Sequence, residues 1–276
     1  MTTRTPVTTA PRPHAARDSM TMLSRQLLHV RRYPEMTVIL LAMPIIFLLL
    51  FVYVLGGTLG AGLPAGAVVP GSGRAAYANY VVPGILLLTI GFIAAGTSTS
   101  VAMDMTQGII ARFRTMSIAP GSVLTGHVLA AVLQSLGSVG VVVLVAFLVG
   151  FRPGADLAGW LAAVALLTGL AFAVAWLSVA CGLVARTVES ASNYPMPLLL
   201  LPFLGSGFVP TESMPAPLGW FSETQPFTPI MDTLRALLLG STLDTGAAWA
   251  AAAWCLGLTV AGYVWARRAY ARPLRG

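Results

Sequence analysis

Lysine is absent from this 276-residue sequence, whose 16 basic residues are all arginines. The phosphate-binding loop of a P-loop ATPase needs a lysine in the pattern G-x-x-x-x-G-K-[ST]. A retinal or pyridoxal Schiff base also forms on a lysine amine. The chain therefore cannot hydrolyse ATP at a Walker site of its own. If ATP drives it, ATP and Mg²⁺ are expected on a separate polypeptide, and no cofactor is expected in this chain.

Charge, cysteine and histidine are scarce as well. Only 9% of the residues are charged and 57% are hydrophobic, whereas a soluble domain carries about 25% charged residues, so the composition indicates an integral membrane protein. The two cysteines, Cys181 and Cys255, lie in apolar segments and are interpreted as small hydrophobic side chains rather than a disulfide. The three histidines are scattered, and no His, Cys, Asp and Glu cluster has the spacing of a metal site.

Long apolar runs predict an all-α integral membrane protein with six transmembrane helices, since a helix needs about 20 apolar residues to span a membrane. The predicted spans are residues 37–55, 81–103, 122–150, 157–184, 194–210 and 246–266. The fifth contains Pro195, Pro197 and Pro202, so we expect it to be kinked or broken. Residues 1–18 are predicted to be a disordered tail, and residues 19–276 a single transmembrane domain.

Two further segments flank the first span. Residues 19–33 place Met20, Leu23, Leu27 and Val30 on one helical face, which predicts an interfacial amphipathic helix, with a charged start to the first span as the alternative. Residues 56–79 are rich in Gly, Ala and Pro and predict a flexible external loop.

A second amphipathic pattern precedes the sixth span. Thr228 could act as the N-cap of this helix, Pro229 stands at its first position, and Gly240 would close its C-terminus. Asp232 and Arg235 interrupt the apolar face, which favours a half-embedded external helix over a seventh span.

The arginines predict that both termini are cytoplasmic. With that orientation thirteen arginines lie inside, namely Arg4, Arg12, Arg17, Arg25, Arg31, Arg32, Arg112, Arg114, Arg186, Arg267, Arg268, Arg272 and Arg275. Only Arg74, Arg152 and Arg235 remain outside. The basic charge is thus a topology signal and a contact with anionic membrane lipid, and it does not indicate nucleic-acid binding.

A short polar block, residues 104–119, separates the second and third spans. Its apolar residues recur at helical spacing with two arginines beside them: Met105, Ile109, Phe113, Met116, Arg112 and Arg114. This pattern predicts a cytoplasmic surface helix that another protein contacts, whereas a loop obeying only the positive-inside rule would not need Phe113. Asp104 is expected to cap this helix at its N-terminus.

In order and spacing, these features resemble the ABC-2 type exporter permeases, in particular the daunorubicin-resistance-like membrane subunits of actinobacteria. The matching pieces are residues 80–85 (Y-V-V-P-G-I), Asp104, Gly108, Ile109, Arg112, Phe113, Arg114, Gly126, residues 151–153 (F-R-P), residues 208–210 (F-V-P), Met214, Pro215, residues 225–229 (Q-P-F-T-P) and Arg235. Two positions depart from the family pattern: Ser117 stands where proline is usual, and Ala131 where an acidic residue often occurs.

The resemblance implies a permease dimer, homodimeric or heterodimeric, in a bacterial plasma membrane, with an ATPase subunit bound to each permease. It also implies that the segment after the second span docks with the ATPase through Asp104, Gly108, Ile109, Arg112, Phe113, Arg114 and Met116. Arg31, Arg32 and Glu35 either add to that contact or anchor the interfacial helix. The expected cargo is a hydrophobic or amphipathic drug, antibiotic or lipid-like natural product.

Polar residues within the spans suggest a path for this cargo. They are Thr97, Ser98, Thr99, Ser100, Gln134 and Ser138, although hydroxyls in membrane helices also serve helix packing. His127 could relay protons, or simply hydrogen-bond near the cytoplasmic end of its span.

Two other function classes compete with an ATP-driven exporter. An ion- or proton-coupled secondary transporter needs acidic residues near the bilayer midplane, and none of the nine carboxylates lies at the centre of a predicted span. A membrane-embedded enzyme has little support, because residues 205–207 (G-S-G) are too weak a nucleophile motif.

Overall fold

The computed structural model describes residues 15–61, 73–110, 112, 121–209 and 214–271, and in these ranges it is all-helical with no strand. The predicted docking residues Phe113, Arg114 and Met116 lie outside the described residues, as do Ser117 and most of the predicted N-terminal tail.

The described chain forms helices of very unequal length. In order they are α1 (Ala15–Arg32), α2 (Pro34–Leu49), the π-helix η1 (Leu50–Leu55), α3 (Gly56–Ala61), α4 (Arg74–Thr106), α6 (Ser122–Val149), α7 (Leu157–Val184), α8 (Val188–Asn193), α9 (Met196–Leu200), the 3-10 helix η2 (Leu201–Leu204), α10 (Ala216–Thr224), α11 (Phe227–Leu239) and α12 (Thr245–Ala271).

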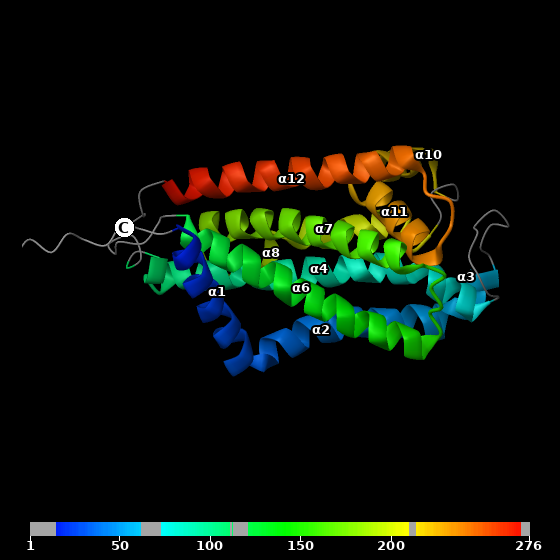
Figure 1. Cartoon of the computed structure of the whole chain (residues 1–276), viewed down its shortest axis with the longest axis horizontal. Helices are drawn as coiled ribbons and strands as arrows, with labels where there is room; N and C mark the ends of the chain where they lie inside the picture. The colour runs from blue at the N-terminus through cyan, green and yellow to red at the C-terminus, as the bar shows by residue number, and fades with distance from the viewer. Residues whose placement is uncertain (1–14, 62–72, 111, 113–120, 210–213, 272–276) are drawn as a thin grey trace, which may run out of the picture.

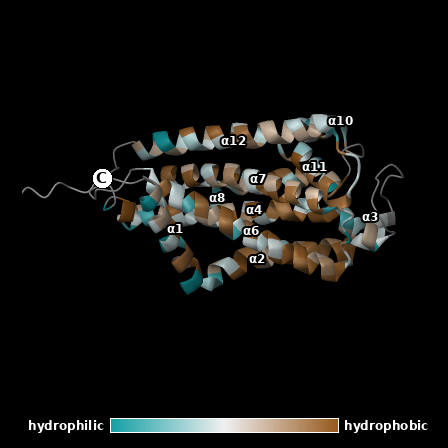
Figure 2. Ribbon diagram, in the orientation of Figure 1, coloured by the Kyte–Doolittle hydropathy of each residue, from teal (hydrophilic) through white to brown (hydrophobic). Residues whose placement is uncertain are grey.

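The long helices lie side by side as an elongated bundle (Figure 1). Helix α1 crosses one end, and α10 and α11 lie at the opposite end. Hydrophobic residues cover most of the length of the helices between these ends (Figure 2). Among the described residues, five helices are long and apolar enough to span a membrane: Pro34–Gly60, Arg74–Thr106, Ser122–Val149, Leu157–Val184 and Thr245–Ala271. The protein is therefore a multi-pass membrane protein.

Helix α4 is the centre of the bundle, in contact with α2, α6, α7, α8 and α11. Small residues are needed where α4 crosses its neighbours, because larger side chains at these points would hold the helices apart. A Cβ atom on Gly182 of α7 would lie 2.5 Å from the Ser98 carbonyl oxygen. By contrast, α2 and α12 leave many apolar side chains exposed, as expected for surfaces that face lipid or a second subunit.

The segment of the predicted fifth span is not one continuous helix. It contains α9 and η2, each of which starts beside a proline, and irregular backbone follows from Gly205. Aromatic rings hold this broken segment to the first span: the Phe208 ring centroid lies 4.6 Å from that of Phe203 and 4.7 Å from that of Phe51. Proline accounts for the break, because it lacks the amide donor that a helix interior requires.

Two predicted boundaries were wrong. The loop expected at residues 56–79 is helical at both ends, since α3 continues to Ala61 and α4 already begins at Arg74. Tyr77, Asn79 and Tyr80, expected in a flexible loop or at its edge, are buried in the bundle. Burial of these amphipathic residues against neighbouring helices extends the helix beyond the purely apolar stretch.

Helix α1 buries Met22, Leu23 and Gln26 against the bundle, whereas Met20 and Leu27, two residues of the predicted interfacial face, are exposed. Their exposure does not contradict an interfacial helix, because the apolar face of such a helix lies in the lipid headgroup region. Helix α1 packs on α6, and the close approach needs a glycine there: a Cβ atom on Gly126 would lie 2.5 Å from the Met22 Cβ atom.

Replacing Gly126 with alanine is expected to separate α1 from α6. Overpacking of this kind costs about 1–3 kcal/mol, so the thermal unfolding temperature of the purified protein should fall. Gly137→Ala on the same helix is the matched control, because a Cβ atom there meets nothing within 4 Å. Equal unfolding temperatures for the two variants would contradict this packing.

Candidate functional site

A polar cluster joins α1 to the ends of α4 and α6. The Arg25 guanidinium donates two hydrogen bonds to the Asp104 carboxylate, from Nη2 to Oδ1 at 2.9 Å and from Nη1 to Oδ2 at 3.1 Å. Asp104 is only 7% exposed, so this bidentate ion pair forms largely out of water. Paired donors of this kind fix orientation as well as charge, and here they tie α1 to α4.

His127 and Gln26 complete this Asp104 cluster, defined as Arg25, Gln26, Asp104 and His127. The His127 Nε2 atom lies 3.1 Å from Asp104 Oδ2 and 3.1 Å from Gln26 Nε2. One ring nitrogen cannot donate to a carboxylate and accept from an amide at once. The consistent arrangement has an Nε2–H group that donates to Asp104, with the Gln26 amide turned so that its oxygen faces the ring.

The position of Asp104 corrects the sequence prediction. We expected an N-cap of the following helix, but Asp104 lies in the last turn of α4 and its carboxylate is used by α1 and α6. Helix α4 instead ends at Thr106, and Gly108 follows it with a φ of +69°, the left-handed conformation that glycine adopts most easily after a helix.

Beyond Gly108 the described residues show how the predicted docking segment begins. Ile110 is fully buried and Ile109 partly buried, whereas Arg112 is exposed. Arg31, Arg32 and Glu35 are also exposed, at the junction of α1 and α2. Arg31, Arg32 and Arg112 are thus exposed, while the buried Ile110 fixes the start of the segment.

A cavity of about 220 Å³ opens beside the Asp104 cluster, between α1, α2, α4 and α6. Arg25, Gln26, Asp104 and His127 all line it. Four of the six predicted cargo residues line this cavity and two do not. Thr97, Thr99, Ser100 and Gln134 line it, whereas Ser98 donates instead to the Ala191 carbonyl oxygen at 2.9 Å and Ser138 is buried elsewhere on α6.

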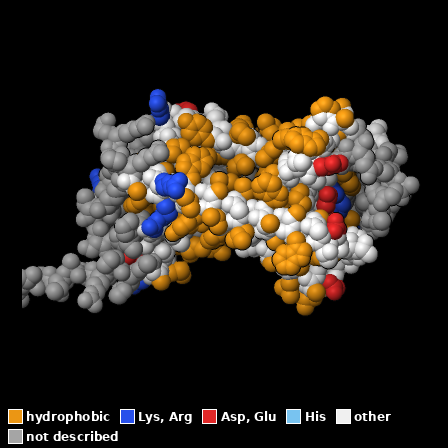
Figure 3. Space-filling model, turned by 90° about the horizontal axis from the view of Figure 1, so that it is seen from above, with side chains coloured by type: hydrophobic (Ala, Val, Ile, Leu, Met, Phe, Trp, Pro, Cys, Tyr) orange, Lys and Arg blue, Asp and Glu red, His pale blue; other side chains and the backbone are white. Residues whose placement is uncertain are grey.

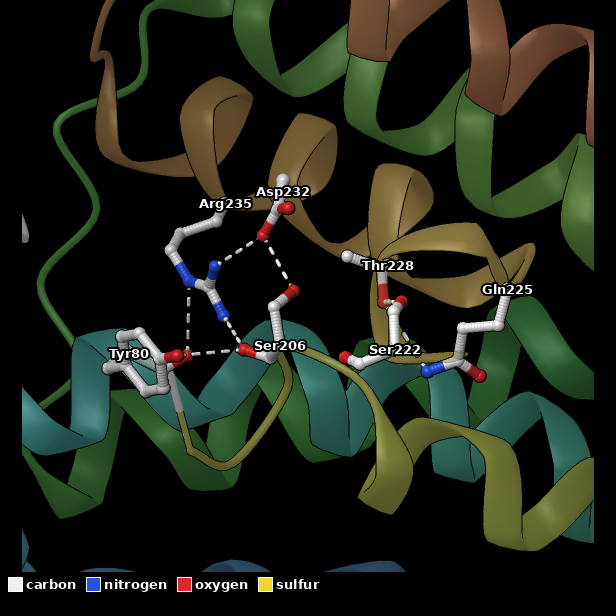
Figure 4. A network of polar contacts seen from close by, with 7 residues as sticks. All are labelled: Tyr80, Ser206, Ser222, Gln225, Thr228, Asp232 and Arg235. Carbon is white, nitrogen blue, oxygen red and sulfur yellow. Dashed lines mark hydrogen bonds and ion pairs between the residues drawn. The ribbon is translucent and has the colours of Figure 1, made fainter. Parts of the chain in front are cut away.

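A second polar cluster lies at the opposite end of the bundle, where α11 meets α4 (Figure 4). This Arg235 cluster consists of Tyr80, Ser206, Asp232 and Arg235. Arg235 donates to Asp232 Oδ1 at 2.8 Å and to the Ser206 carbonyl oxygen at 2.6 Å. Its guanidinium carbon also lies 4.1 Å from the centroid of the Tyr80 ring, a cation–π contact.

The remaining members close the Arg235 cluster. The Tyr80 hydroxyl donates to the Ser206 carbonyl oxygen at 2.9 Å, and the Ser206 hydroxyl donates to Asp232 Oδ1 at 2.6 Å. Backbone packing supports the same junction, because a Cβ atom on Gly84 would lie 3.0 Å from the Gly207 carbonyl oxygen. The cluster therefore joins α4, the irregular segment after η2 and α11.

Helix α11 differs from its prediction at one end only. Thr228 is not the N-cap, because α11 begins at Phe227 and the Thr228 hydroxyl donates to the Ser222 carbonyl oxygen of α10. At the other end Gly240 adopts the left-handed conformation with a φ of +67°, as its place in the sequence predicted.

Sequence reasoning missed both clusters as clusters. Asp232 and Arg235 were noted only as interruptions of an apolar face, yet a charged pair at helical i, i+3 spacing was itself a signal of a paired contact. Nothing in the sequence linked Arg25 to Asp104, which stand 79 residues apart. Cys181 and Cys255 are buried free thiols. In the described ranges no three His, Cys, Asp or Glu residues are placed to hold a metal ion.

The part of the chain that matches a known protein family includes the residues of both clusters. The family model described as ABC-2 type transporter matches residues 18–239. The chain is also similar to the protein named "Daunorubicin resistance ABC transporter permease protein DrrB1" from Streptomyces coeruleorubidus, with 27% identity over 231 residues, 83% of this chain and 78% of that protein.

Proposed function

The chain belongs to the ABC-2 type transporter family, and we propose that it is the permease subunit of an exporter that moves a hydrophobic or amphipathic compound out of the cell. The observation that carries this proposal is the family match over residues 18–239. The similarity to a daunorubicin resistance permease supports a drug, antibiotic or lipid-like natural product as the cargo.

Because the sequence contains no lysine, the ATPase is a separate subunit that carries the ATP and Mg²⁺. The working unit is a dimer of permeases, as a homodimer or a heterodimer, with two ATPase subunits and surrounding membrane lipid. The exposed apolar faces of α2 and α12 offer surfaces for the lipid and the second permease.

The membrane is a bacterial plasma membrane, with both termini in the cytoplasm. The face in Figure 3 supports this orientation: arginines gather mostly at the end where α1 lies, and acidic side chains gather at the opposite end. The positive-inside rule then makes the α1 end cytoplasmic. Six crossings are needed to return the chain to that side, so the broken segment of α8, α9 and η2 serves as the fifth.

The ATPase docks on the segment that follows α4. The Asp104 cluster supports this role, because it connects the base of that segment to α1 and α6 through short, largely buried hydrogen bonds. A movement of the segment would therefore be passed to three helices at once. Arg31, Arg32 and Glu35 lie exposed on the same end and extend the contact surface.

Combining Phe113→Ala with Arg114→Glu is expected to weaken ATPase recruitment at least tenfold, since an apolar anchor and a charge pair each contribute about 1–2 kcal/mol at such a contact. Co-purification of the ATPase from membranes measures the effect. Arg186→Glu is the control, an exposed arginine on the same side but remote in sequence. Unchanged recruitment by the Phe113/Arg114 variant would contradict the proposed docking site.

An ion- or proton-coupled secondary transporter is the second candidate. One observation favours it: a buried carboxylate, Asp104, contacts His127, as in proton relays. The bidentate pairing with Arg25 counts against this, because it stabilises the ionised carboxylate and leaves no role for its protonation.

A further inference from the structure

The cavity beside the Asp104 cluster is lined by two opposite charges that already pair with each other. Arg25 and Asp104 both belong to its lining, and the Arg25 guanidinium donates two hydrogen bonds to the Asp104 carboxylate. This pair adds no excess of either charge to the lining. A charged ligand would leave water without finding an unpaired counter-charge, which is costly. The cavity therefore favours an uncharged head group.

Hydrogen-bond acceptors line one part of the cavity. The Thr97 and Thr99 hydroxyls each donate to the carbonyl oxygen four residues earlier in α4, at 3.0 and 3.1 Å. Their oxygen lone pairs remain for a ligand. The Gln134 amide donates from Nε2 to Thr37 Oγ1 at 3.0 Å, which leaves its Oε1 atom as a further acceptor.

Donors accompany these acceptors. The Gln26 amide, with its oxygen turned toward His127, leaves its NH₂ group as a donor. Tyr33, Ser100 and Gln107 also line the cavity, and their hydroxyl and amide groups both donate and accept. A head group that also donates and accepts, such as a hydroxyl or an amide, matches this lining better than an ammonium, which only donates, or a carboxylate, which only accepts.

The other side of the cavity is apolar. Val30 of α1, Met36 and Leu40 of α2, and Met103 of α4 line it. Methionine side chains adapt to ligands of varied shape. A volume of about 220 Å³ is below the roughly 300–1,000 Å³ of drug-sized pockets. The cavity thus fits the head and the first part of the tail of an amphipathic molecule, and the exposed apolar face of α2 continues beyond it.

We propose that this cavity binds uncharged amphipathic molecules, with a hydroxyl- or amide-bearing head toward Gln26, Thr97 and Gln134 and the apolar tail toward α2. As the cytoplasmic loading site for cargo, it rests on the proposed function and narrows the class of cargo. Asp104 and Gln107 line the cavity and also lead into the docking segment. Occupancy and ATPase movement therefore act on the same few residues.

The test uses cysteine labelling of the full-length permease in phosphatidylcholine nanodiscs, without ATPase or ATP. Ser100→Cys places a near-isosteric thiol in the cavity lining, and the two native cysteines are buried. The probe is monododecanoylglycerol, whose head carries hydroxyls and no charge. We expect it to slow maleimide labelling saturably, about threefold at twice the half-saturating concentration, as simple occupancy requires.

Three compounds with the same chain length, compared at equal concentration in the nanodisc, test the head group. Dodecylamine and dodecanesulfonate each bring an unpaired charge, and methyl dodecanoate is uncharged but has no donor. Each should leave the labelling rate of Ser100→Cys unchanged. Labelling of Ser192→Cys, at an exposed position on α8, should respond to none of the four compounds.

Substitutions in the lining test the contacts. Thr97→Val, added to Ser100→Cys, removes an acceptor oxygen while keeping the branched shape, and should raise the half-saturating concentration of monododecanoylglycerol severalfold. Gln134→Leu should act in the same direction. Thr89→Val is the matched control, because the Thr89 hydroxyl makes the same bond to the carbonyl oxygen four residues earlier in α4 but Thr89 does not line the cavity.

Equal protection by any of the three comparison compounds, protection at Ser192→Cys, or no protection at Ser100→Cys would each overturn the proposal. These results are independent of the ATPase, so a permease that recruits no ATPase but shows this protection would keep the site and lose its role in ATP-driven export. In vesicles with ATPase and ATP, Thr97→Val should raise the KM for uptake of a fluorescent monoacylglycerol. An unchanged KM would contradict the loading role and indicate a resident membrane lipid.

Discussion

Asp104→Asn is expected to lower export about tenfold and to destabilise the protein by about 2 kcal/mol. The substitution removes the charge that pairs with Arg25 and weakens the acceptor of the His127 Nε2–H group. A hydrogen bond to a charged group is worth about 1.5–3 kcal/mol. The loss stays below the 3–5 kcal/mol of a fully buried pair because the Arg25 side chain is 35% exposed and can regain water.

The expected loss of export has a mechanical cause. Without the ion pair, α1 is connected to α4 only through Gln26 and His127, so movement of the docking segment is passed on to it less effectively. Coupling between sites in proteins is typically 1–3 kcal/mol, or about 5–150-fold, which brackets the tenfold expectation. Initial export rates and unfolding temperatures measure the two effects.

Glu189→Gln is the matched control, because it makes the same chemical change at an exposed carboxylate on the same side of the bundle. A double-mutant cycle with Arg25→Met should give an Arg25–Asp104 coupling energy of about 1–2 kcal/mol. Additive effects of the two substitutions would show that the pair does not act as a unit.

Arg235→Met is expected to have the larger effect on folding, a loss of about 3 kcal/mol. Arg235 is only 14% exposed and satisfies the Ser206 carbonyl oxygen, Asp232 and the face of the Tyr80 ring together. Methionine keeps an unbranched apolar stem but removes the guanidinium, so the Ser206 carbonyl oxygen and Asp232 each lose one of their two donors. Asp232, at 41% exposure, can turn to water, which keeps the cost below that of a fully buried ion pair.

Arg235→Lys should retain part of the stability, since an ammonium group keeps the charge but cannot reach both acceptors with the planar fork of arginine. Exposed Arg186→Met is the control for loss of a surface arginine. The measurements are the unfolding temperature of the purified permease and protease sensitivity of α10 and α11. If Arg235→Met were as stable as Arg186→Met, the Arg235 cluster would have no role in holding α11.

The sequence predicted the helical class and the longest spans because twenty-residue apolar runs have few alternatives in a membrane. It also predicted that Gly240 ends a helix, since this depends only on local backbone preference. The contacts of α1 with the bundle were not predicted. Met22, Leu23 and the polar Gln26 are buried there, and only Leu23 belongs to the apolar face that the sequence indicated.

The reason lies in partners that are distant in sequence. Gln26 is buried because His127 and Asp104 lie opposite it, and no local pattern in residues 19–33 contains that information. The predictions that Asp104 and Thr228 are N-caps were wrong for the same reason. Asp104 accepts hydrogen bonds from Arg25, and Thr228 donates to the Ser222 carbonyl oxygen, so contacts distant in sequence replace the local ones. The docking residues Phe113, Arg114 and Met116 remain predictions from the sequence.

The most direct test of the account is transport into inside-out vesicles that contain this permease and its ATPase subunit, with a fluorescent amphipathic compound as the probe. We predict uptake that requires ATP and both subunits and that persists when a protonophore removes the proton gradient. Uptake by the permease alone, driven by a pH gradient and abolished by the protonophore, would contradict ATP-driven export.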